Sequence, residues 1–571
     1  MGTDQNLIET LDGKLNELFA DWNIYTTIIA TVVCLFIVYP WFSGKEPDIH
    51  PLLLARQAAA SYVRQPGYSA VYRSLEVPPG YPLRTGLNVK DPGAPKWSGG
   101  KDGDLRDVWR QAVRGPTDQK GEPKGSPGKI ITVLGSQKVR EQNLNDISKE
   151  INVIGQHIQA HGGQRVAVWL SNSVELLATI FAGSFYGFCT ILLPYEPTSR
   201  HLIPRLGLAK VEVLVAEAGT VELSAVAKEY PNIKQVIWVV KEGSRHIPWG
   251  ETPSHMEGKI DVSAWHEVVE DLKEQTSAEL PQNSKENTLP TLEAFWTTSQ
   301  KEVGQLFAFS QKNLVAAIAA LMAALPRNQR LNSSDLFLPI DSLSYSYPLT
   351  LTMAALFSNC SIALNSVSGP DTDFLAAISS LEPTVVVASA STIANVHSKL
   401  EKQGSSLVHK MQRRLQQHSF DAGYMPSSSV LATLVATDAA VAKAVNKLRL
   451  LLISKRSSTE LEPSLNPDAL SNLRAALDTR IIYALTSGKV AGAIAQTHCF
   501  DYRRQPTGSK GYFGAPLSSV EILLKDKGEY KTTDEEDPKG EVIVQGPAVI
   551  DREVNLGILG TLGNDNGLSE I

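Results

Sequence analysis

The sequence is poor in cysteine, with only four among its 571 residues. Cys34, Cys189, Cys360 and Cys499 are scattered, and no two of them have the CxxC spacing of zinc ribbons and redox motifs. We therefore expect neither a disulfide framework nor a cysteine-based zinc site, and a reducing compartment fits this composition best.

The chain also lacks an excess of basic residues, since 54 Lys and Arg stand against 60 Asp and Glu, giving a net charge of −6. Nucleic-acid-binding proteins carry clustered positive charge, so no nucleic-acid partner is expected. The GxGxxG fingerprint, the Walker phosphate loop, the GxSxG elbow and the HExxH pattern are all missing. The eleven histidines are scattered, so the sequence predicts neither a metal site nor a catalytic residue.

One long apolar run without charges is present, at residues 24–43. A helix needs about 20 apolar residues to cross a bilayer. Trp22 and Tyr25 at one end of the run, and Tyr39 and Trp41 at the other, match an aromatic belt. The alternative, a secretory signal peptide, would need a basic start and a small-residue cleavage site, which are lacking. The run is therefore predicted to be a transmembrane helix in contact with membrane lipid.

Basic residues near the ends of the run predict its orientation, because Lys and Arg stay on the cytosolic side. Lys14 precedes it, whereas Lys45, Arg56 and Arg64 follow it. Residues 1–23 are thus expected to be a short lumenal N-terminus, and the large C-terminal part is expected in the cytosol. The endoplasmic reticulum is the expected membrane; the peroxisome, lipid droplet and mitochondrial outer membrane are the alternatives.

The rest of the chain divides by composition. Residues 44–128 are rich in Pro and Gly and are interpreted as a linker or an arm that wraps the domain. From 129 to 510, apolar runs alternate with amphipathic stretches, which indicates an α/β domain with a parallel sheet. Residues 241–290 are polar and are interpreted as a surface insertion. Residues 511–571 contain two alternating runs, which predict a small antiparallel β subdomain.

Several individual elements can be predicted within this plan. Ser173 is a plausible N-cap for a helix that reaches about residue 185, and the apolar stretch 314–325 is too short to span a bilayer and indicates a buried helix. Strands are predicted at residues 165–170, 188–194, 211–215, 233–240, 306–309, 336–340, 384–388, 449–453 and 480–484.

The order of these segments resembles the adenylate-forming (AMP-binding) superfamily, and most of all the large N-terminal domain of the long-chain fatty acyl-CoA synthetases. The resemblance runs from about residue 147 to residue 571, and its marks are 162–177, 337–339, 382–387, 511–522 and 538–547. It implies two parallel α/β subdomains followed by a small antiparallel β subdomain. It also implies that the family's C-terminal lid domain, which carries the adenylation lysine, is absent.

Enzymes of this family form an acyl-adenylate from ATP and a fatty acid, and coenzyme A then displaces AMP. Their phosphate loop reads roughly Tyr-Thr-Ser-Gly-Ser-Thr-Gly-x-Pro-Lys-Gly, which matches residues 296–306 and keeps hydroxyls at Thr297 and Thr298. The first two glycines and the lysine of this loop are replaced here by Ser299, Glu302 and Gln305. Glu302 places an anion where a phosphate should lie, and without the glycines the loop loses its φ > 0 freedom.

The other ligand positions of the family differ in the same direction. Tyr483 and Thr486 are kept from the motif Tyr-Gly-x-Thr-Glu. The glycine pair beside the adenine is replaced here by Ser454 and Lys455. Ser487 replaces the Mg²⁺ ligand, and Thr561 replaces the ribose ligand. A serine hydroxyl cannot supply the anionic oxygen that Mg²⁺ prefers.

These replacements predict a membrane-anchored pseudoenzyme that acts as a scaffold or as a sensor of acyl lipids, with no cofactor. Losing one such group costs about 10²–10³ in rate, and here several groups change together. Fatty acid or acyl-CoA and a protein are its other expected partners. The alternative is an active long-chain fatty acid–CoA ligase with atypical site residues, which would use ATP and Mg²⁺. A third hypothesis is an incomplete gene model of an ordinary enzyme.

Overall fold

A computed structural model describes residues 23–31, 34, 46–90, 94–95, 97–117, 124–134, 138–196, 199–247, 249, 260–282, 289–298, 301–365, 372–403, 416–426, 439–457, 462–504, 511–533 and 537–571. The chain divides into two compact units, residues 1–48 and residues 49–571.

In the first unit, the described residues 24–31 are helical. Asn23 caps this helix, because its Oδ1 accepts hydrogen bonds from the backbone N–H groups of Tyr25 (2.9 Å) and Thr26 (3.1 Å). Residues 32–33 and 35–43 of the predicted transmembrane segment lie outside the described residues. Within the part of the chain that the structure describes, every helix falls short of the length and apolarity needed to cross a bilayer. The membrane anchor therefore stays a prediction.

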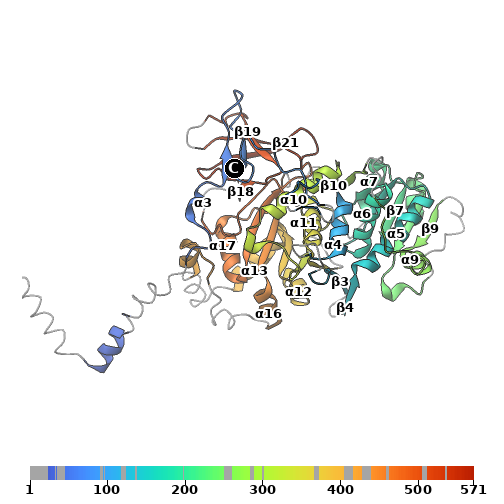
Figure 1. The fold of residues 1–571 in the computed structure, drawn as a ribbon, viewed down its shortest axis with the longest axis horizontal. Helices are drawn as coiled ribbons and strands as arrows, with labels where there is room; N and C mark the ends of the chain where they lie inside the picture. The colour runs from blue at the N-terminus through green and yellow to red at the C-terminus, as the bar shows by residue number, and fades with distance from the viewer. Residues whose placement is uncertain are drawn as a thin grey trace, which may run out of the picture. The chain divides into compact units, whose positions relative to one another are not determined.

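A seven-stranded sheet lies in the N-terminal half of the second unit, with the strand order β11-β10-β6-β5-β7-β8-β9 (Figure 1). Neighbours from β10 to β9 are parallel, and β11 closes the edge as the antiparallel partner of β10. The strands are β5 (Arg165–Trp169), β6 (Cys189–Leu192), β7 (Val213–Glu217), β8 (Gln235–Val239), β9 (Asp261–Ala264), β10 (Leu292–Thr298) and β11 (Lys301–Phe309).

The two faces of this sheet are covered by different helices, because successive side chains of a strand point to opposite sides. Val166 and Val168 of β5 join the core beneath one group of helices, whereas Ala167 and Trp169 join a second core beneath another. The first group comprises α5 (Leu144–Ala160), α6 (Val174–Tyr186) and α9 (Trp265–Lys273), and the second comprises α7 (Leu202–Ala209) and α8 (Leu223–Glu229). Ser173 caps α6 as predicted, since its Oγ accepts from the Leu176 N–H at 3.2 Å.

The second sheet has fifteen strands in the order β1-β2-β19-β20-β21-β22-β18-β17-β16-β15-β14-β12-β13-β3-β4. Along this strand order, neighbouring strands from β16 to β3 are parallel to each other, and neighbouring strands from β1 to β17 are antiparallel. Its strands are β1 (Ala58–Ala60), β2 (Tyr72–Ser74), β3 (Lys129–Leu134), β4 (Lys138–Asn143), β12 (Leu336–Pro339), β13 (Ser361–Asn365), β14 (Val385–Ser389), β15 (Leu450–Arg456), β16 (Arg480–Thr486), β17 (Ala495–Gln496), β18 (Gly511–Pro516), β19 (Glu521–Lys525), β20 (Lys539–Gln545), β21 (Glu553–Leu562) and β22 (Leu568–Glu570).

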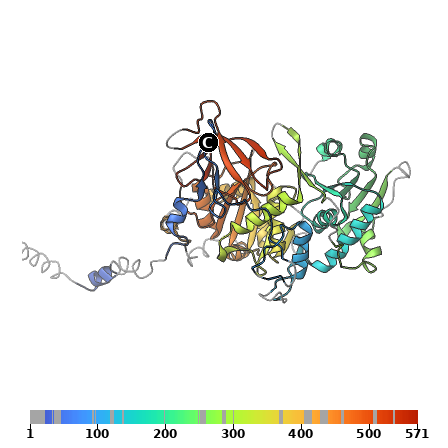
Figure 2. The same ribbon diagram turned by 45° about the horizontal axis from the view of Figure 1, so that its top comes forward.

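The parallel parts of the two sheets and the antiparallel strands of the second confirm the α/β part of the predicted fold class, and the stretch 314–325 does belong largely to a buried helix, α10. Figure 2 shows the β10–β11 hairpin between the orange-to-red strands of the second sheet and the green strands of the first.

The remaining α-helices are α3 (Pro51–Ala55), α4 (Leu105–Arg114), α10 (Gln311–Ala323), α11 (Ser346–Phe357), α12 (Phe374–Ser379), α13 (Ala390–Gln403), α16 (Ala439–Lys447) and α17 (Pro467–Leu477). Short 3₁₀ helices are η1 (Ser199–His201), η2 (Glu242–Ser244) and η3 (Arg327–Gln329).

The interpretation of residues 44–128 as a linker or arm is correct only for part of its length. Gln57 does tie the segment to the C-terminal strands, since its Nε2 donates to Asp501 Oδ2 (2.8 Å) and to Tyr512 Oη (2.7 Å). However, β1 and β2 are strands of the second sheet, and α4 is a core helix whose Trp109 is fully buried. The helix itself contains no Pro or Gly. The many prolines on either side of it make the whole segment resemble a linker.

The interpretation of residues 241–290 as a surface insertion is also wrong in part. Asp261–Ala264 forms β9, which pairs with β8 in parallel and so extends the first sheet. Trp265 and Val269 of the following helix are buried in the core. The segment is polar on average because α9 buries only one of its faces.

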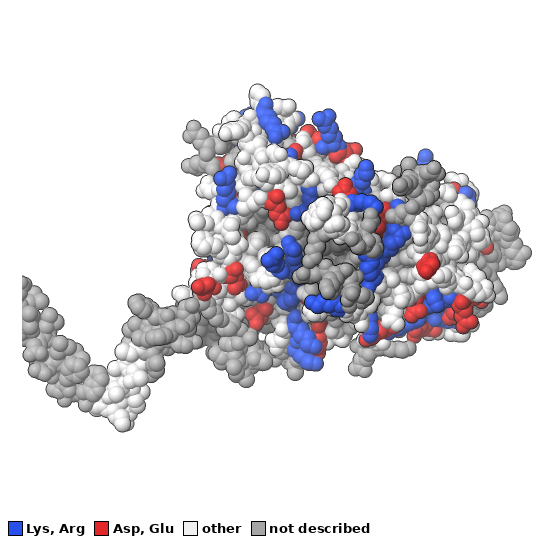
Figure 3. Space-filling model, in the orientation of Figure 1, with Lys and Arg blue, Asp and Glu red and all other residues white. Residues whose placement is uncertain are grey.

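Charged side chains of both signs are distributed over the face shown in Figure 3, with several Lys and Arg around its centre and Asp and Glu among them. This mixture agrees with the small negative net charge of the chain.

Candidate functional site

Polar side chains gather where the parallel strands of the second sheet end. Asp341 lies just after β12, Arg456 is the last residue of β15, and Thr486 is the last residue of β16. Arg456 and Thr486 are paired in the β15–β16 ladder, so these strand ends are directly adjacent. Ligands of open α/β sheets bind outside the carboxyl ends of the strands, so this is where a nucleotide would be expected.

A group of five buried or half-buried residues occupies this position, namely Asp341, Tyr345, Ser454, Arg456 and Glu462, here called the Arg456 cluster. An N–H of the Arg456 guanidinium donates to Asp341 Oδ1 at 3.0 Å, and Ser454 Oγ donates to Asp341 Oδ2 at 3.2 Å. The guanidinium carbon lies 3.7 Å from the centre of the Tyr345 ring, close enough for a cation–π interaction. Glu462 accepts a hydrogen bond from the Arg456 backbone N–H at 2.6 Å.

The charges of the Arg456 cluster are almost inaccessible to water. The Asp341 side chain has no exposed surface, and the side chains of Glu462 and Arg456 are 4% and 12% exposed. Burial by itself lowers the pKa of the Arg456 guanidinium, but the neighbouring Tyr345, Asp341 and Glu462 outweigh burial and raise that pKa. Arg456 is therefore charged at every pH at which the protein folds. Burial raises the pKa of Glu462, and Arg456 opposes this shift.

Lys455, predicted at the adenine position, is also held by the chain itself. Its side chain is 7% exposed and forms an ion pair with Glu570 of β22. Its backbone carbonyl accepts a hydrogen bond from Thr486 Oγ1 at 3.0 Å. The predicted remnant Thr486 thus contacts Lys455, a position where a family ligand is predicted to be lost, and Glu570 of β22 pairs with the Lys455 side chain.

The hairpin that matches the family's phosphate loop is β10–β11. Thr297 and Thr298 end β10, whereas Ser299 lies outside the described residues. Glu302 and Gln305 belong to β11, and Gln305 pairs with Trp296. The bend is therefore followed by a strand that is irregular near its start, because the β10–β11 register shifts between Trp296 and Thr298 and Gly304 has a φ of 90°.

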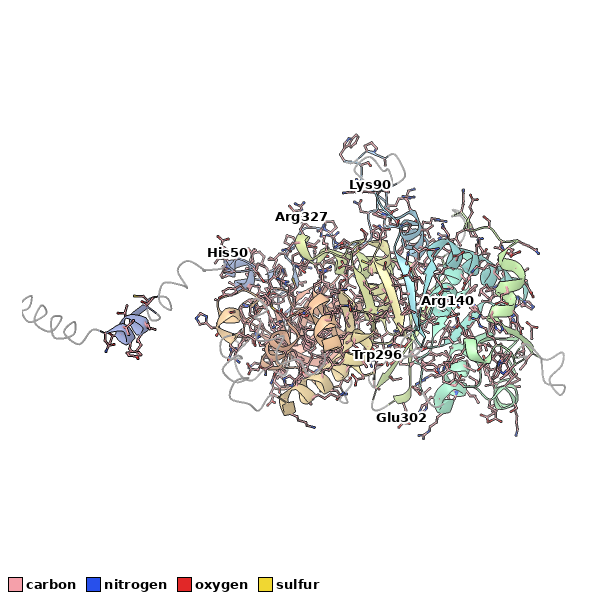
Figure 4. All side chains as sticks on the ribbon, turned by 90° about the horizontal axis from the view of Figure 1, so that it is seen from below. His50, Lys90, Arg140, Trp296, Glu302 and Arg327 are labelled. Atoms are coloured by element: carbon pink, nitrogen blue, oxygen red, sulfur yellow. The ribbon has the colours of Figure 1, made fainter. Side chains whose placement is uncertain are left out.

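The hairpin is fastened by its backbone carbonyls. Arg205, with a side chain only 1% exposed, donates to the carbonyl oxygens of Glu302 (3.2 Å) and Val303 (2.9 Å). The Glu302 side chain is 67% exposed and lies 3.8 Å from His201 Nε2, a long contact with an imidazole. In Figure 4, Glu302 lies toward the outer end of the hairpin, farther from the core than Trp296.

Trp296, which precedes the two threonines, connects the hairpin to the Arg456 cluster. Its ring meets that of Tyr345 edge-on at 5.8 Å between centroids. It also packs on Gly488, where an added Cβ would lie 2.7 Å from Trp296 Cβ and Cγ. Trp296 therefore connects the hairpin both to Tyr345, on which Arg456 of β15 stacks, and to Gly488, which follows β16.

Of the remaining predicted residues, Tyr483 and Ser487 are buried parts of the scaffold, and Thr561 is half-buried. Tyr483 has no exposed surface, its hydroxyl accepts from the Leu465 N–H at 3.2 Å, and burial raises its pKa. Ser487 is buried just after β16, and its Oγ accepts from the Lys489 N–H at 3.3 Å. Thr561 stands in β21 opposite Ser569, next to the Gly560–Glu570 pair. It is thus close to the Lys455–Glu570 ion pair, and its buried Oγ1 has no hydrogen-bond partner among the described residues.

Sequence motifs predict only Ser454 among the five members of the Arg456 cluster. Arg456 stands two residues farther along the same strand, and its position beside a lost glycine pair is the one signal that points to it. Asp341 and Glu462 come from loops about 120 residues apart and carry no motif that would connect them. A pocket of about 290 Å³ is lined by other residues, including Ile49, Leu53 and His498.

No protein-family model matches the chain. Among curated protein sequences, an uncharacterised protein of Saccharomyces cerevisiae is 22% identical over 324 residues, which is 55% of this chain and 52% of the yeast protein. The chain therefore spans about half the length of that relative.

Solved structures give broader matches. An anthranilate CoA ligase, AuaEII, in complex with anthranoyl-AMP has a TM-score of 0.57 at 12% identity, over 82% of this chain and 76% of that one. A benzoate CoA ligase from Burkholderia xenovorans has a TM-score of 0.55 at 12% identity, over 82% and 79%. An acyl-CoA synthetase of Brucella canis has a TM-score of 0.56 at 15% identity, over 82% and 74%. At this level of identity, the likeness concerns the fold.

Proposed function

We propose that this chain, which has the fold of the adenylate-forming CoA ligases, is a non-catalytic, membrane-anchored protein that scaffolds lipid enzymes or senses acyl lipids. The Arg456 cluster supports this proposal most strongly, because it fills the strand ends where a nucleotide would bind with the chain's own ion pairs. The Glu302 carboxylate on the hairpin and the Ser487 hydroxyl in place of a carboxylate ligand support it further.

Magnitudes favour the inactive state over nucleotide binding. To admit an adenylate, Arg456 would have to leave both Asp341 and the Tyr345 ring. Breaking a buried ion pair costs about 3–5 kcal/mol, because a buried charge is left without a partner. Binding with a Kd between 1 mM and 1 μM supplies about 4–8 kcal/mol in total. Most of the binding energy of a nucleotide would therefore be consumed by opening the cluster.

We expect the full chain, purified in detergent, to release no AMP from ATP when given Mg²⁺, coenzyme A and palmitate or oleate. A nucleotide-free site also predicts that Mg-ATP leaves the melting temperature unchanged, whereas a ligand at 100 times its Kd would stabilise the fold by about 2.7 kcal/mol. A long-chain acyl-CoA synthetase prepared in the same detergent is the positive control for both measurements.

AMP release would reject the proposal if it also disappeared in the variant Thr486→Ala, whose hydroxyl sits at the strand end beside Lys455. The chain would then be the alternative, an active long-chain fatty acid–CoA ligase that uses ATP and Mg²⁺ with atypical residues. Release that persists in Thr486→Ala would come from a contaminating enzyme and would leave the inactive site as proposed.

The proposed anchor comprises residues 24–43, in contact with membrane lipid, with the C-terminal part in the cytosol and the endoplasmic reticulum as the membrane. Cys34 is an internal reporter for this proposal, because it lies within the run and is exposed in the chain alone. The other three thiols give a low background at pH 7. Burial raises the pKa of Cys189 to about 11 and also raises that of Cys360, while Cys499 is buried.

In native membranes, we therefore expect a charged maleimide to leave Cys34 unlabelled until the membrane is dissolved in denaturing detergent. The variant Glu46→Cys places a thiol at an exposed position just after the run and is expected to react in intact membranes from the cytosolic side. Labelling of Cys34 as rapid as that of the Glu46→Cys thiol would show that residues 24–43 are in water.

A further inference from the structure

A second group of polar side chains lies far from the strand ends, on the seven-stranded sheet. His157 is on the last turn of α5, His161 caps the same helix one turn later, and Asp261 is the first residue of β9. One ligand atom from each of the three lies within 4.8 Å of the other two. Histidines spaced i, i+4 face the same side of a helix, so the helix presents both rings to the carboxylate.

The hydrogen bonds of His161 leave one ring nitrogen for a ligand. Its Nδ1 lies 2.7 Å from the backbone carbonyl of His157, a contact that requires Nδ1 to donate a proton. Nε2 of the same ring faces Asp261 Oδ2 at 3.4 Å. In the neutral ring, Nε2 carries a lone pair, and this lone pair would face a lone pair of Asp261 Oδ2 unless a cation lies between the two atoms. Zinc-ligating histidines typically donate their second N–H to a carbonyl or a carboxylate in this way.

Gln235 supplies a second, independent observation. This fully buried residue of β8 pairs with Asp261, and its Nε2 lies 2.9 Å from His157 Nε2 and 3.0 Å from Asp261 Oδ2. Its Oε1 is buried and has no hydrogen-bond partner among the described residues. A buried acceptor without a partner costs about 1–3 kcal/mol. Rotating the amide by half a turn would point this oxygen at the histidine and the carboxylate, which an ion between them would make favourable.

We propose that His157, His161, Asp261 and the amide oxygen of Gln235 form a site for a transition-metal dication of the Zn²⁺ class. Two imidazole nitrogens and a carboxylate oxygen are the donors such ions prefer. Around a tetrahedral ion with bonds near 2.1 Å, neighbouring donors lie roughly 3.4 Å apart. His161 Nε2 and Asp261 Oδ2, at 3.4 Å, have this spacing. Gln235 Nε2, whose place the amide oxygen would take after the rotation, lies 2.9 Å from His157 Nε2 and 3.0 Å from Asp261 Oδ2.

The bound ion would fasten the end of α5 to the edge strand β9. This strand follows residues 251–259, which lie outside the described part of the chain, and it is the last strand of its sheet. Scattered histidines in the sequence predict no metal site, because nothing in the spacing of residues 157, 161, 235 and 261 shows that the fold brings them together. The proposal is independent of whether the nucleotide site is active.

The test is calorimetric titration of the metal-free full chain with ZnCl₂, together with the visible absorption of bound Co²⁺. We expect one Zn²⁺ per chain and the Co²⁺ spectrum of a tetrahedral site. His161→Ala and Asp261→Asn are each expected to weaken Zn²⁺ binding by about tenfold to 100-fold, since the first removes an imidazole ligand and the second removes the negative charge of the carboxylate. Both side chains are more than one third exposed, so both variants should fold, as circular dichroism would verify.

The control is a second i, i+4 pair on another helix. In α13, His397 Nε2 lies 3.7 Å from Glu401 Oε1, without a second histidine. His397→Ala is expected to leave the stoichiometry and affinity of Zn²⁺ binding unchanged. Failure of the wild-type chain to bind Zn²⁺, or equal binding by wild type, His161→Ala and Asp261→Asn, would overturn the proposal. In the first case the group is an ordinary His–Asp ion pair, and in the second the ion is held elsewhere.

Discussion

Replacing Arg456 by alanine is expected to lower the free energy of unfolding by about 3–5 kcal/mol, the usual cost of breaking a buried ion pair. The change leaves Asp341, whose side chain has no exposed surface, and Glu462, which is 4% exposed, without their cationic partner. It also removes the stack on Tyr345. Chemical denaturation followed by circular dichroism measures the effect as a shift of the midpoint at constant slope.

Two variants make this result specific to the cluster. Arg327→Ala removes an exposed guanidinium of the same kind, and it should change stability by less than about 0.5 kcal/mol. Arg456→Lys keeps the charge but loses the planar fork and the stack, so an intermediate loss is expected. Equal stability of Arg456→Ala and wild type would mean that the cluster does not hold the strand ends together. The main support for a nucleotide site that is filled by the chain's own side chains would then disappear.

Replacing Trp109 by alanine is expected to destabilise the protein by about 3–5 kcal/mol, the typical cost of emptying a buried aromatic site. Trp109 has no exposed surface, its ring lies 4.6 Å from that of Phe181, and its Nε1 donates to Ser148 Oγ at 2.9 Å. The residue belongs to α4, within the segment whose composition resembles a linker. The measurement is the same denaturation experiment.

Trp97 offers a matched control in the same segment, because its side chain is 87% exposed. Trp97→Ala should lie within about 0.5 kcal/mol of wild type. Similar small effects of the two substitutions would mean that α4 is a loosely attached arm, as its Pro-rich and Gly-rich surroundings suggest. A large effect of Trp109→Ala alone would establish that the domain core begins well before residue 129.

The sequence predicts most of the sheet strands because their apolar runs are short and bounded by polar residues. The run 165–170 corresponds to β5, and the run 480–484 lies within β16. It does not predict α4 or β9, because composition averaged over a window conceals one buried face in a polar segment. The burial of Trp109 and Trp265 depends on partners elsewhere in the fold, which the composition of their own segments does not show.

The candidate site is predicted less completely than the fold. Family motifs locate the strand ends through Ser454, Lys455, Thr486 and Ser487, and the structure places these residues close together. Motifs identify what is missing from a site, but they do not show what replaces it. The Arg456 cluster depends on contacts such as Ser454 with Asp341, which join loops that only the folded sheet brings together.

The pairing of β2 with β19 has a consequence for how the chain is made. Arg73 and Glu521, which face each other in this pair, are 448 residues apart in the chain. A ribosome adding about 5–20 residues per second needs roughly 20–90 s to produce the partner of an already finished strand. During that interval β2 presents unpaired backbone groups, which favour aggregation. Newly made chains should therefore depend on chaperones until their last strands emerge.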